Sequence, residues 1–333
     1  MSKIIYLLGA GASRGVRDEK QYGMNYYSSG MPIVSEIQDC LDKYCSTFYP
    51  HISFGDGRSH IKHPAVYKEL TWLRDICKDN PTLDTYAKKM YVKGDLKELE
   101  RLKRALAIFF TLIQSREKRD MRYDSFMEAV VDDRGMMNSQ ISILTWNYDK
   151  QCEYAFHEYE LSKTSSSHQF MYARIACKGY TSRYLDYSDS NLVKLNGMAA
   201  FKPLQDQYLF EEDDYTLDRF ERMISSNTTD FTNFISYAWE EDNDFIDKVV
   251  PLTNDTEMLV VIGYSMPPVN RNVDMKLLQG MKNLKSIVIQ DKNCDLVKRH
   301  LLNLLDDCQK QALENHISYE TDLSSFFIPT SII

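Results

Sequence analysis

Short apolar runs, most of them ending in glycine or a small polar residue, recur along the chain and predict buried strands. Their β-branched content and their lack of apolar–polar alternation are typical of parallel strands that are covered on both faces. The predicted strands are Ile4–Leu8, Ile141–Thr145, Phe170–Cys177, Leu192–Leu195, Met258–Ile262 and Ser286–Gln290. Because helical patterns alternate with these runs, the sequence predicts an α/β fold with a doubly wound, mostly parallel, Rossmann-like sheet.

Helical periodicity dominates the stretch between the first strand and the second. From Ile33 onward apolar residues recur at helical spacing, and a series of helical patterns extends from about residue 63 to 133. We therefore expect one domain over residues 1–333, with its core in 1–40 and 140–333 and a helical insertion over 41–139.

Composition limits the class of protein. The 333 residues carry a formal net charge of -8, and 43% of them are hydrophobic. These are ordinary values for a globular chain, and no stretch approaches the roughly 18 uninterrupted apolar residues of a membrane helix. Net negative charge is the wrong sign for a general nucleic-acid binder, so nucleic acid is not expected to be bound directly. Seven scattered cysteines indicate reduced thiols and a cytoplasmic protein.

Two local charge concentrations stand apart from this average. The segment Asp206–Glu257 holds 15 acidic residues and three basic ones, which favours either a solvated face on two helices or a partner-binding surface. The basic run Arg116, Lys118, Arg119 and Arg122 is interpreted as a solvated helix end, with contact to a nucleic acid or an acidic partner as the alternative.

The first predicted strand leads into a glycine turn, Gly9-Ala10-Gly11-Ala12-Ser13. Glycines let a backbone turn tightly and approach a pyrophosphate. The dehydrogenase version of this turn needs a third glycine where Arg14 stands, so hydride transfer is disfavoured. The chain also lacks the Gly-Lys-Ser/Thr of a P-loop.

Polar residues follow three other predicted strands. Asn147 and Asp149 come after the second strand, Asn196 follows Lys194-Leu195, and Gly263-Tyr264-Ser265 follows Met258–Ile262. In an open α/β sheet, ligands bind at the carboxyl ends of the strands. We therefore expect these segments and the glycine turn to converge on one crevice.

Five motifs in this order resemble the SIR2-like (sirtuin-related) family, and among its members the NAD hydrolases of bacterial antiphage defence. They are residues 9–13, Gly30-Met31-Pro32 with Glu36, Thr-Trp-Asn-Tyr-Asp at 145–149, Lys-Leu-Asn-Gly at 194–197, and Val-Ile-Gly-Tyr-Ser at 261–265. The resemblance implies a SIR2-type fold and an NAD+ glycohydrolase that releases nicotinamide and ADP-ribose in abortive infection. It also implies regulation by a homo-oligomer or by a partner protein of the same defence system.

The resemblance assigns roles to individual residues. Gly9, Ala10, Gly11, Ala12 and Ser13 would hold the NAD+ phosphates, and Pro32 lies in a loop that would close over the nicotinamide ribose. Asn147 would act near the ribose and the attacking water, with Asp149 beside it. Gly263, Tyr264 and Ser265 would lie on the phosphate and ribose side, and Asp291, next to Gln290, would meet the adenosine part.

Asn196 stands where the family has a histidine. An asparagine amide cannot serve as a general base at neutral pH. Three explanations stay open: another base such as His157 or His168, a binding-only site, or a substitution that traps ligand. The alternative function is therefore a catalytically silent sensor or scaffold that binds NAD or ADP-ribose.

A metal is not expected. The deacylating sirtuins hold a structural zinc with paired Cys-x-x-Cys motifs, and this sequence contains no such pair. Removal of acyl groups from lysine is therefore disfavoured.

Overall fold

The computed structural model describes residues 4–14, 30–47, 51–53, 59–61, 63–116, 119–159, 175–178, 192–201, 213–226, 233–240, 243–330 and 332. The chain divides into two compact units. The first comprises Met1–Gly30, Lys118–Met198 and Ser236–Ile333, and the second Met31–Glu117 and Ala199–Ile235. These boundaries assign residues 118–139 to the same unit as the predicted strands, whereas the sequence placed them in the helical insertion.

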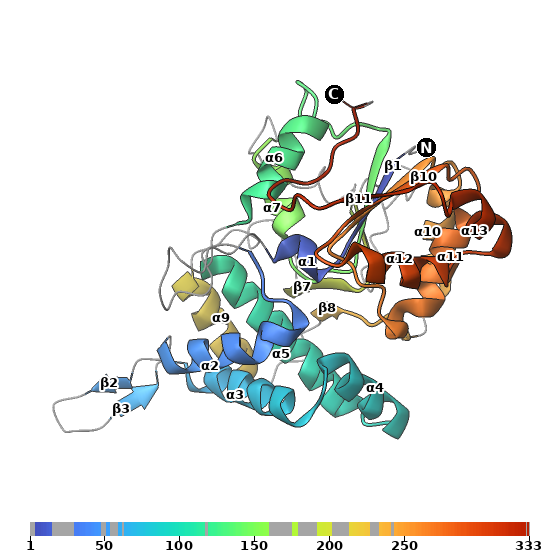
Figure 1. Ribbon diagram of the computed structural model, residues 1–333. Helices are drawn as coiled ribbons and strands as arrows, with labels where there is room; N and C mark the ends of the chain where they lie inside the picture. The colour runs from blue at the N-terminus through green and yellow to red at the C-terminus, as the bar shows by residue number, and fades with distance from the viewer. Residues whose placement is uncertain are drawn as a thin grey trace. The chain divides into compact units, whose positions relative to one another are not determined.

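A parallel sheet forms the centre of the first unit (Figure 1). Its described strands lie in the order β11-β10-β9-β1-β4-β6-β5, and every neighbouring pair is parallel. The strands are β1 (Ile4–Leu8), β4 (Ile141–Thr145), β5 (Ile175–Cys177), β6 (Leu192–Lys194), β9 (Met258–Ile262), β10 (Ser286–Gln290) and β11 (Ile317–Glu320). The residues before Ile175 in the predicted strand at 170–177 lie outside the described residues.

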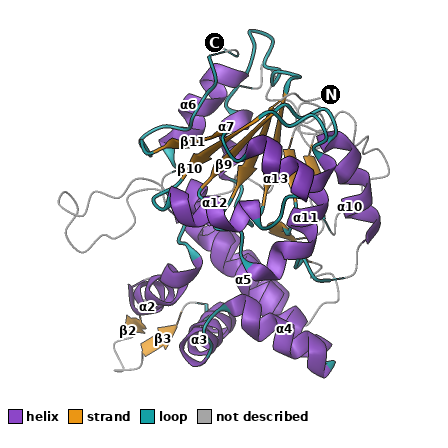
Figure 2. Cartoon of the chain, turned by 45° about the vertical axis from the view of Figure 1, so that its right-hand side comes forward, coloured by secondary structure: helices purple, strands orange, loops and turns teal. Residues whose placement is uncertain are grey.

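Helices cover both faces of this sheet, as alternate side chains of β1 demonstrate. Ile5 and Leu7 pack into one core with α10, α11, α12 and α13. The ring of Tyr6, on the opposite face, packs edge-on against Phe126 of α6, with the ring centroids 4.8 Å apart. Figure 2 shows the sheet between these helices. The predicted doubly wound α/β fold is therefore confirmed. The helical elements of this unit are α1 (Ala10–Ser13), α6 (Met121–Val130), α7 (Gln151–His157), α10 (Asn243–Val249), η3 (Val250–Thr253), η4 (Pro268–Asn270), α11 (Arg271–Gly280), α12 (Cys294–Leu302) and α13 (Asp307–Leu313).

The strand ends share one register. Leu8 at the end of β1 pairs with Thr145 of β4 and with Ile262 of β9. Thr145 in turn pairs with Lys194, and Ile262 with Gln290. The residues that follow these five strands therefore leave the sheet side by side along its carboxyl edge.

The second unit is mainly helical. Its helices are η1 (Val34–Glu36), α2 (Ile37–Thr47), α3 (Pro64–Asp79), α4 (Leu83–Lys93), α5 (Leu96–Arg116) and α9 (Asp213–Ser225), with the small strands β2 (His51–Ser53), β3 (Ser59–Ile61), β7 (Gly197–Phe201) and β8 (Asn233–Ile235). β7 begins in the first unit and ends in the second. Ile37, Leu41 and Tyr44 are buried, as their helical spacing predicts. Among the described residues, no helix combines the length and apolar character needed to span a bilayer.

Candidate functional site at the carboxyl edge of the sheet

The turn after β1 packs tightly against the turn after β9. Gly9 N–H donates to the carbonyl of Ile262 (3.1 Å), and Gly11 N–H donates to that of Gly263 (2.9 Å). A Cβ on Gly9 would lie 2.6 Å from the Gly263 carbonyl oxygen, and one on Gly11 would lie 2.8 Å from Gly263 Cα. Gly263 itself has a φ of +57°. Close approach of two backbones therefore accounts for these glycines without any ligand.

The same contacts occupy donors that a phosphate would use. Besides Gly9 and Gly11, Ala12 donates its N–H to the carbonyl of Gly9 (2.9 Å). Ala10 is exposed at the start of the turn, and Ser13 is buried. Phosphate binding through Gly9, Gly11 or Ala12 would therefore have to compete with existing hydrogen bonds.

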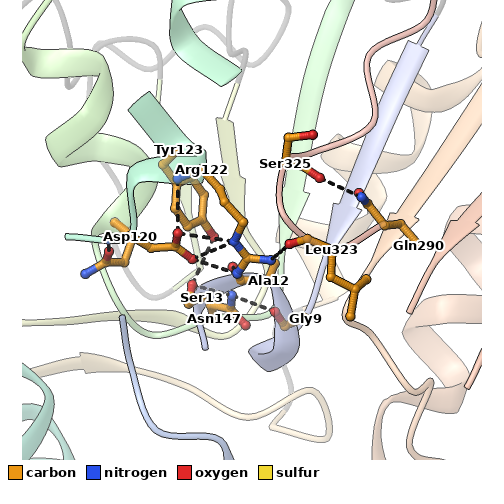
Figure 3. Close-up of polar contacts among 11 residues, drawn as sticks. Gly9, Ala12, Ser13, Asp120, Arg122, Tyr123, Asn147, Gln290, Leu323 and Ser325 are labelled. Atoms are coloured by element: carbon orange, nitrogen blue, oxygen red, sulfur yellow. Dashed lines mark hydrogen bonds and ion pairs between the residues drawn. The ribbon is translucent and has the colours of Figure 1, made fainter. Parts of the chain in front are cut away.

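Asn147 links the end of β4 to this turn (Figure 3). Its Nδ2 donates to the carbonyl of Gly9 (2.9 Å) and to Ser13 Oγ (3.0 Å), and its backbone N–H donates to Thr145 Oγ1 (3.1 Å). Ser13 Oγ also shares a hydrogen bond of 2.9 Å with the hydroxyl of Tyr123. Both amide hydrogens of Asn147 are thus used inside the protein, so Oδ1 is the atom that this side chain can offer to a ligand.

Asp149 lies beside a buried ion pair. Lys194 Nζ and Glu153 Oε1 are 3.0 Å apart and both side chains are buried; Lys194 Nζ also donates to the backbone carbonyl of Asp149. Burial raises the pKa of Asp149, and the nearby Lys194 only partly offsets this. Asp149 Oδ1 accepts the N–H of Gln151 (3.1 Å). The carboxyl group of Asp149 is therefore held in place, and its environment favours the protonated form more than water does.

The pKa values of two lysines in this cluster are shifted in opposite directions. Burial lowers the pKa of Lys150 to about 8. Burial also disfavours the charge on Lys194, but the carboxyl groups of Glu153 and Asp149 raise its pKa overall. The sequence did not lead us to predict Lys150, Gln151 and Glu153 as site residues. The pattern that could have indicated them is a run of polar residues immediately after the end of a strand.

Asn196 presents a buried acceptor. Leu195 N–H donates to the carbonyl of Thr145 (2.9 Å), which holds this segment beside β4, and the carbonyl of Asn196 accepts Ser236 N–H (2.8 Å). Asn196 is 8% exposed, and its side-chain Oδ1 has no hydrogen-bond partner within the described part of the chain. An unsatisfied buried acceptor costs about 1–3 kcal/mol. A ligand hydroxyl or amide that donated to Asn196 Oδ1 would remove this cost.

Tyr264 belongs to a buried network that also contains Trp146. Its hydroxyl donates to Asp274 Oδ2 (2.7 Å) and accepts from Asn270 Nδ2 (3.0 Å). The rings of Tyr264 and Trp146 are stacked with centroids 6.0 Å apart, and Trp146 Nε1 donates to Asp274 Oδ1 (3.2 Å). Both aromatic side chains are buried, so they support the strand ends from within the core. The adjoining Ser265 is exposed.

The end of β10 contacts the C-terminal segment. Gln290 is buried, and its Nε2 donates to the carbonyl of Ser325 (2.7 Å) while its Oε1 accepts Phe327 N–H (3.0 Å). Asp291 is half-buried, and its Oδ1 accepts Asn293 N–H (2.8 Å) before α12 begins. Gln290 therefore binds protein backbone at the place where the resemblance puts the adenosine part of NAD+.

The interpretation of the basic run as a solvated helix end is wrong for Arg119 and Arg122. Arg122 is 8% exposed and forms an ion pair of 2.6 Å with Asp120. Arg119 is half-buried and pairs with Asp124 at 2.7 Å. Asp120 precedes Arg122 by two residues and Asp124 follows Arg119, so both charges are neutralised inside the first unit. Lys118 lies outside the described residues.

Of the predicted site residues, those that follow β1, β4, β6, β9 and β10 meet along one edge of the sheet. Pro32 belongs to the second unit. His157 is half-buried at the end of α7, and His168 lies outside the described residues. Across the described ranges, no three side chains of His, Cys, Asp or Glu are grouped to hold a metal ion.

No protein-family model matches the chain, and no curated protein matches its sequence. Among solved structures, the chain is similar to one described as "The Structural basis of Sirtuin Substrate Affinity", with a TM-score of 0.36 and 12% sequence identity over 96% of this chain and 89% of that chain. This similarity is too low to support an argument about fold or function. We therefore assign the fold from the sheet itself and infer function from the residues along its carboxyl edge.

Proposed function

We propose that this protein binds NAD+ at the carboxyl edge of the sheet and cleaves it to nicotinamide and ADP-ribose. The observation that carries the proposal is the common register of the strand ends, which brings the Gly9 turn, Asn147, Asn196 and Gly263 side by side. Ligands of open α/β sheets bind at this edge. The five motifs named in the sequence supply the choice of NAD+ among nucleotides.

The amide oxygens of Asn147 and Asn196 suit this reaction. The bond between ribose C1′ and the pyridinium nitrogen breaks, nicotinamide leaves with the electron pair, and the oxygen of water bonds to C1′ as its proton passes to solvent. The transition state carries positive charge on the ribose. Oriented oxygen atoms in a buried site stabilise that charge and position the ribose hydroxyls or the water.

Purified protein incubated with NAD+ tests the proposal. We expect release of nicotinamide, followed by chromatography, together with ADP-ribose binding measured by calorimetry. Absence of both would refute the proposal.

A second function is favoured by Asn196. Its Oδ1 has no partner among the residues that the structure describes. It can accept a hydrogen bond but cannot act as a base, which suits a sensor or scaffold that binds NAD or ADP-ribose without turnover. Measurable ADP-ribose binding with no nicotinamide release at any protein concentration would select this alternative.

We further propose that the protein serves as the effector of a bacterial antiphage system and is regulated by assembly or by a partner protein. An unregulated NAD+ hydrolase would deplete its own cell. The concentration of acidic residues in Asp206–Glu257 supports the proposal that this segment binds a partner. Its helices α9 and α10 belong to different units. We expect specific activity to rise with protein concentration or on addition of the partner. Full activity of a monomer at every concentration would contradict this regulation.

A further inference from the structure

Arg122 lies between the Gly9–Ser13 turn and the C-terminal segment Asp322–Phe327 (Figure 3). Its Nη2 donates to the carbonyl of Ala12 (2.8 Å), and its Nη1 donates to that of Leu323 (3.1 Å). Nε and Nη2 both bond to the carboxylate of Asp120, at 3.0 and 2.6 Å. One guanidinium thus contacts two backbone segments that lie far apart in the sequence.

The geometry of these contacts is specific to arginine. Arg122 and Asp120 are both buried, and a buried ion pair is tolerated only when its remaining donors are satisfied. A lysine ammonium lacks the planar fork that serves the carboxylate and two carbonyl groups in different directions. The position therefore requires more than a positive charge.

The C-terminal segment is held by its backbone and by one aromatic ring. Besides the bonds from Gln290, the hydroxyl of Tyr6 donates to the carbonyl of Phe327 (3.1 Å). The ring of Phe326 packs edge-on against Tyr123 at 4.9 Å between centroids, and Arg122 lies 5.0 Å from its centre. Phe326 thereby covers the two residues of α6 that contact the turn.

Those two residues are consecutive. Arg122 bonds to the carbonyl of Ala12, and Tyr123 bonds to the hydroxyl of Ser13. Any shift of the C-terminal segment that moves Phe326 or Leu323 therefore reaches the turn through both side chains.

We propose that Arg122 is a positioning residue for the Gly9–Ser13 turn and that the segment Asp322–Phe327 sets the geometry of this turn through Arg122. The C-terminal segment then influences ligand binding at the carboxyl edge of the sheet without contacting the ligand itself. The consequence for ligand affinity rests on the proposed function, whereas the effect on the turn does not.

Arg122→Lys tests the inference, with Arg134→Lys as its matched control. Arg134 also pairs with an aspartate two residues earlier, Asp132, at 2.7 Å, but its side chain is 79% exposed and contacts neither segment. We expect Arg122→Lys to speed hydrogen exchange of the backbone amides in residues 9–14 and to raise the Kd for ADP-ribose about tenfold. Arg134→Lys should change neither quantity.

Phe326→Ala provides a second route that leaves the buried charge pair intact. We expect faster exchange in residues 9–14 with this variant and restoration by Phe326→Leu. The double variant Arg122→Lys/Phe326→Ala should be less impaired than the sum of the two single variants, because part of the effect of Phe326 on the turn passes through Arg122.

Unchanged exchange in residues 9–14 in both Arg122→Lys and Phe326→Ala would overturn the inference, as would full additivity in the double variant. If wild-type protein fails to bind ADP-ribose, the proposed function fails while the exchange measurements still decide the role of Arg122. If Arg122→Lys does not fold, the Phe326 pair decides it.

Discussion

Asn147 performs two tasks with one amide group, and alanine at this position removes both. Asn147→Ala removes the oxygen available to a ligand as well as the donors to Gly9 and Ser13. We expect nicotinamide release to fall at least 100-fold. ADP-ribose should still bind, with a higher Kd, because the variant loosens the turn but leaves the ligand contacts that lie away from the reacting centre. Hydrolysis of NAD+ at the parental rate by this variant would remove the assignment of the site.

Asn196 allows the opposite experiment, a gain of function. If the missing base limits turnover, Asn196→His should raise nicotinamide release by about 10²-fold or more. The rate should climb as the pH rises through roughly 6 to 7, where histidine loses its proton, and the parent protein should lack this step. An unchanged rate and pH profile would show that another group already performs the proton transfer.

Asp274 makes stability depend on pH. Burial raises its pKa to about 7, although Tyr264 and Trp146 donate hydrogen bonds to its carboxyl group. In the unfolded chain this carboxyl loses its proton near pH 4, so its favourable contribution is complete below that pH and declines as the pH rises to about 7. We expect the free energy of unfolding to fall, relative to Asp274→Asn, by up to about 1.4 kcal/mol per pH unit over this window. If the free energies of unfolding of the two proteins, measured in urea, changed by the same amount between pH 4 and 7, the prediction would be wrong.

At the scale of single elements, the buried strands are the part of the fold that sequence predicts best. Ile4–Leu8, Ile141–Thr145, Met258–Ile262 and Ser286–Gln290 agree with β1, β4, β9 and β10 at both ends, because a strand buried on both faces is a continuous apolar run. β11, at the edge of the sheet, escaped prediction since Ser318 and Tyr319 are exposed and its pattern resembles a loop.

Helix α3 offers a test of tertiary capping. The carboxylate of Glu221, on α9, accepts the N–H groups of Ala65 and Val66 at 2.9 and 3.0 Å, at the start of α3. We expect Glu221→Ala to lower the free energy of unfolding by about 1–2 kcal/mol in urea. Glu128→Ala, which removes an exposed carboxylate from α6, should have a much smaller effect. Equal effects of the two variants would show that capping contributes nothing here.

At the scale of the whole molecule, the partners within the site are the part that sequence could not supply. The polar residues after each strand were found because a parallel sheet brings strand ends together. Arg122 was misassigned because its contact with Leu323 joins residues separated by 201 positions, and no local pattern encodes such a pair. Gln290 is predicted only as the last residue of a strand. Its bonds to the C-terminal segment cannot be inferred from the sequence around it.

The position of β1 at the middle of the sheet has a consequence for biosynthesis. β1, the first of the described strands, pairs with β4 and β9, which begin at residues 141 and 258. The hydroxyl of Tyr6 donates to the carbonyl of Phe327 across 321 positions. An apolar strand therefore leaves the ribosome long before either neighbour exists, and closing such long loops slows folding. We expect the nascent chain to need chaperone protection over residues 4–8 until β9 has emerged, and newly made protein to resist proteolysis only after Phe327 has emerged.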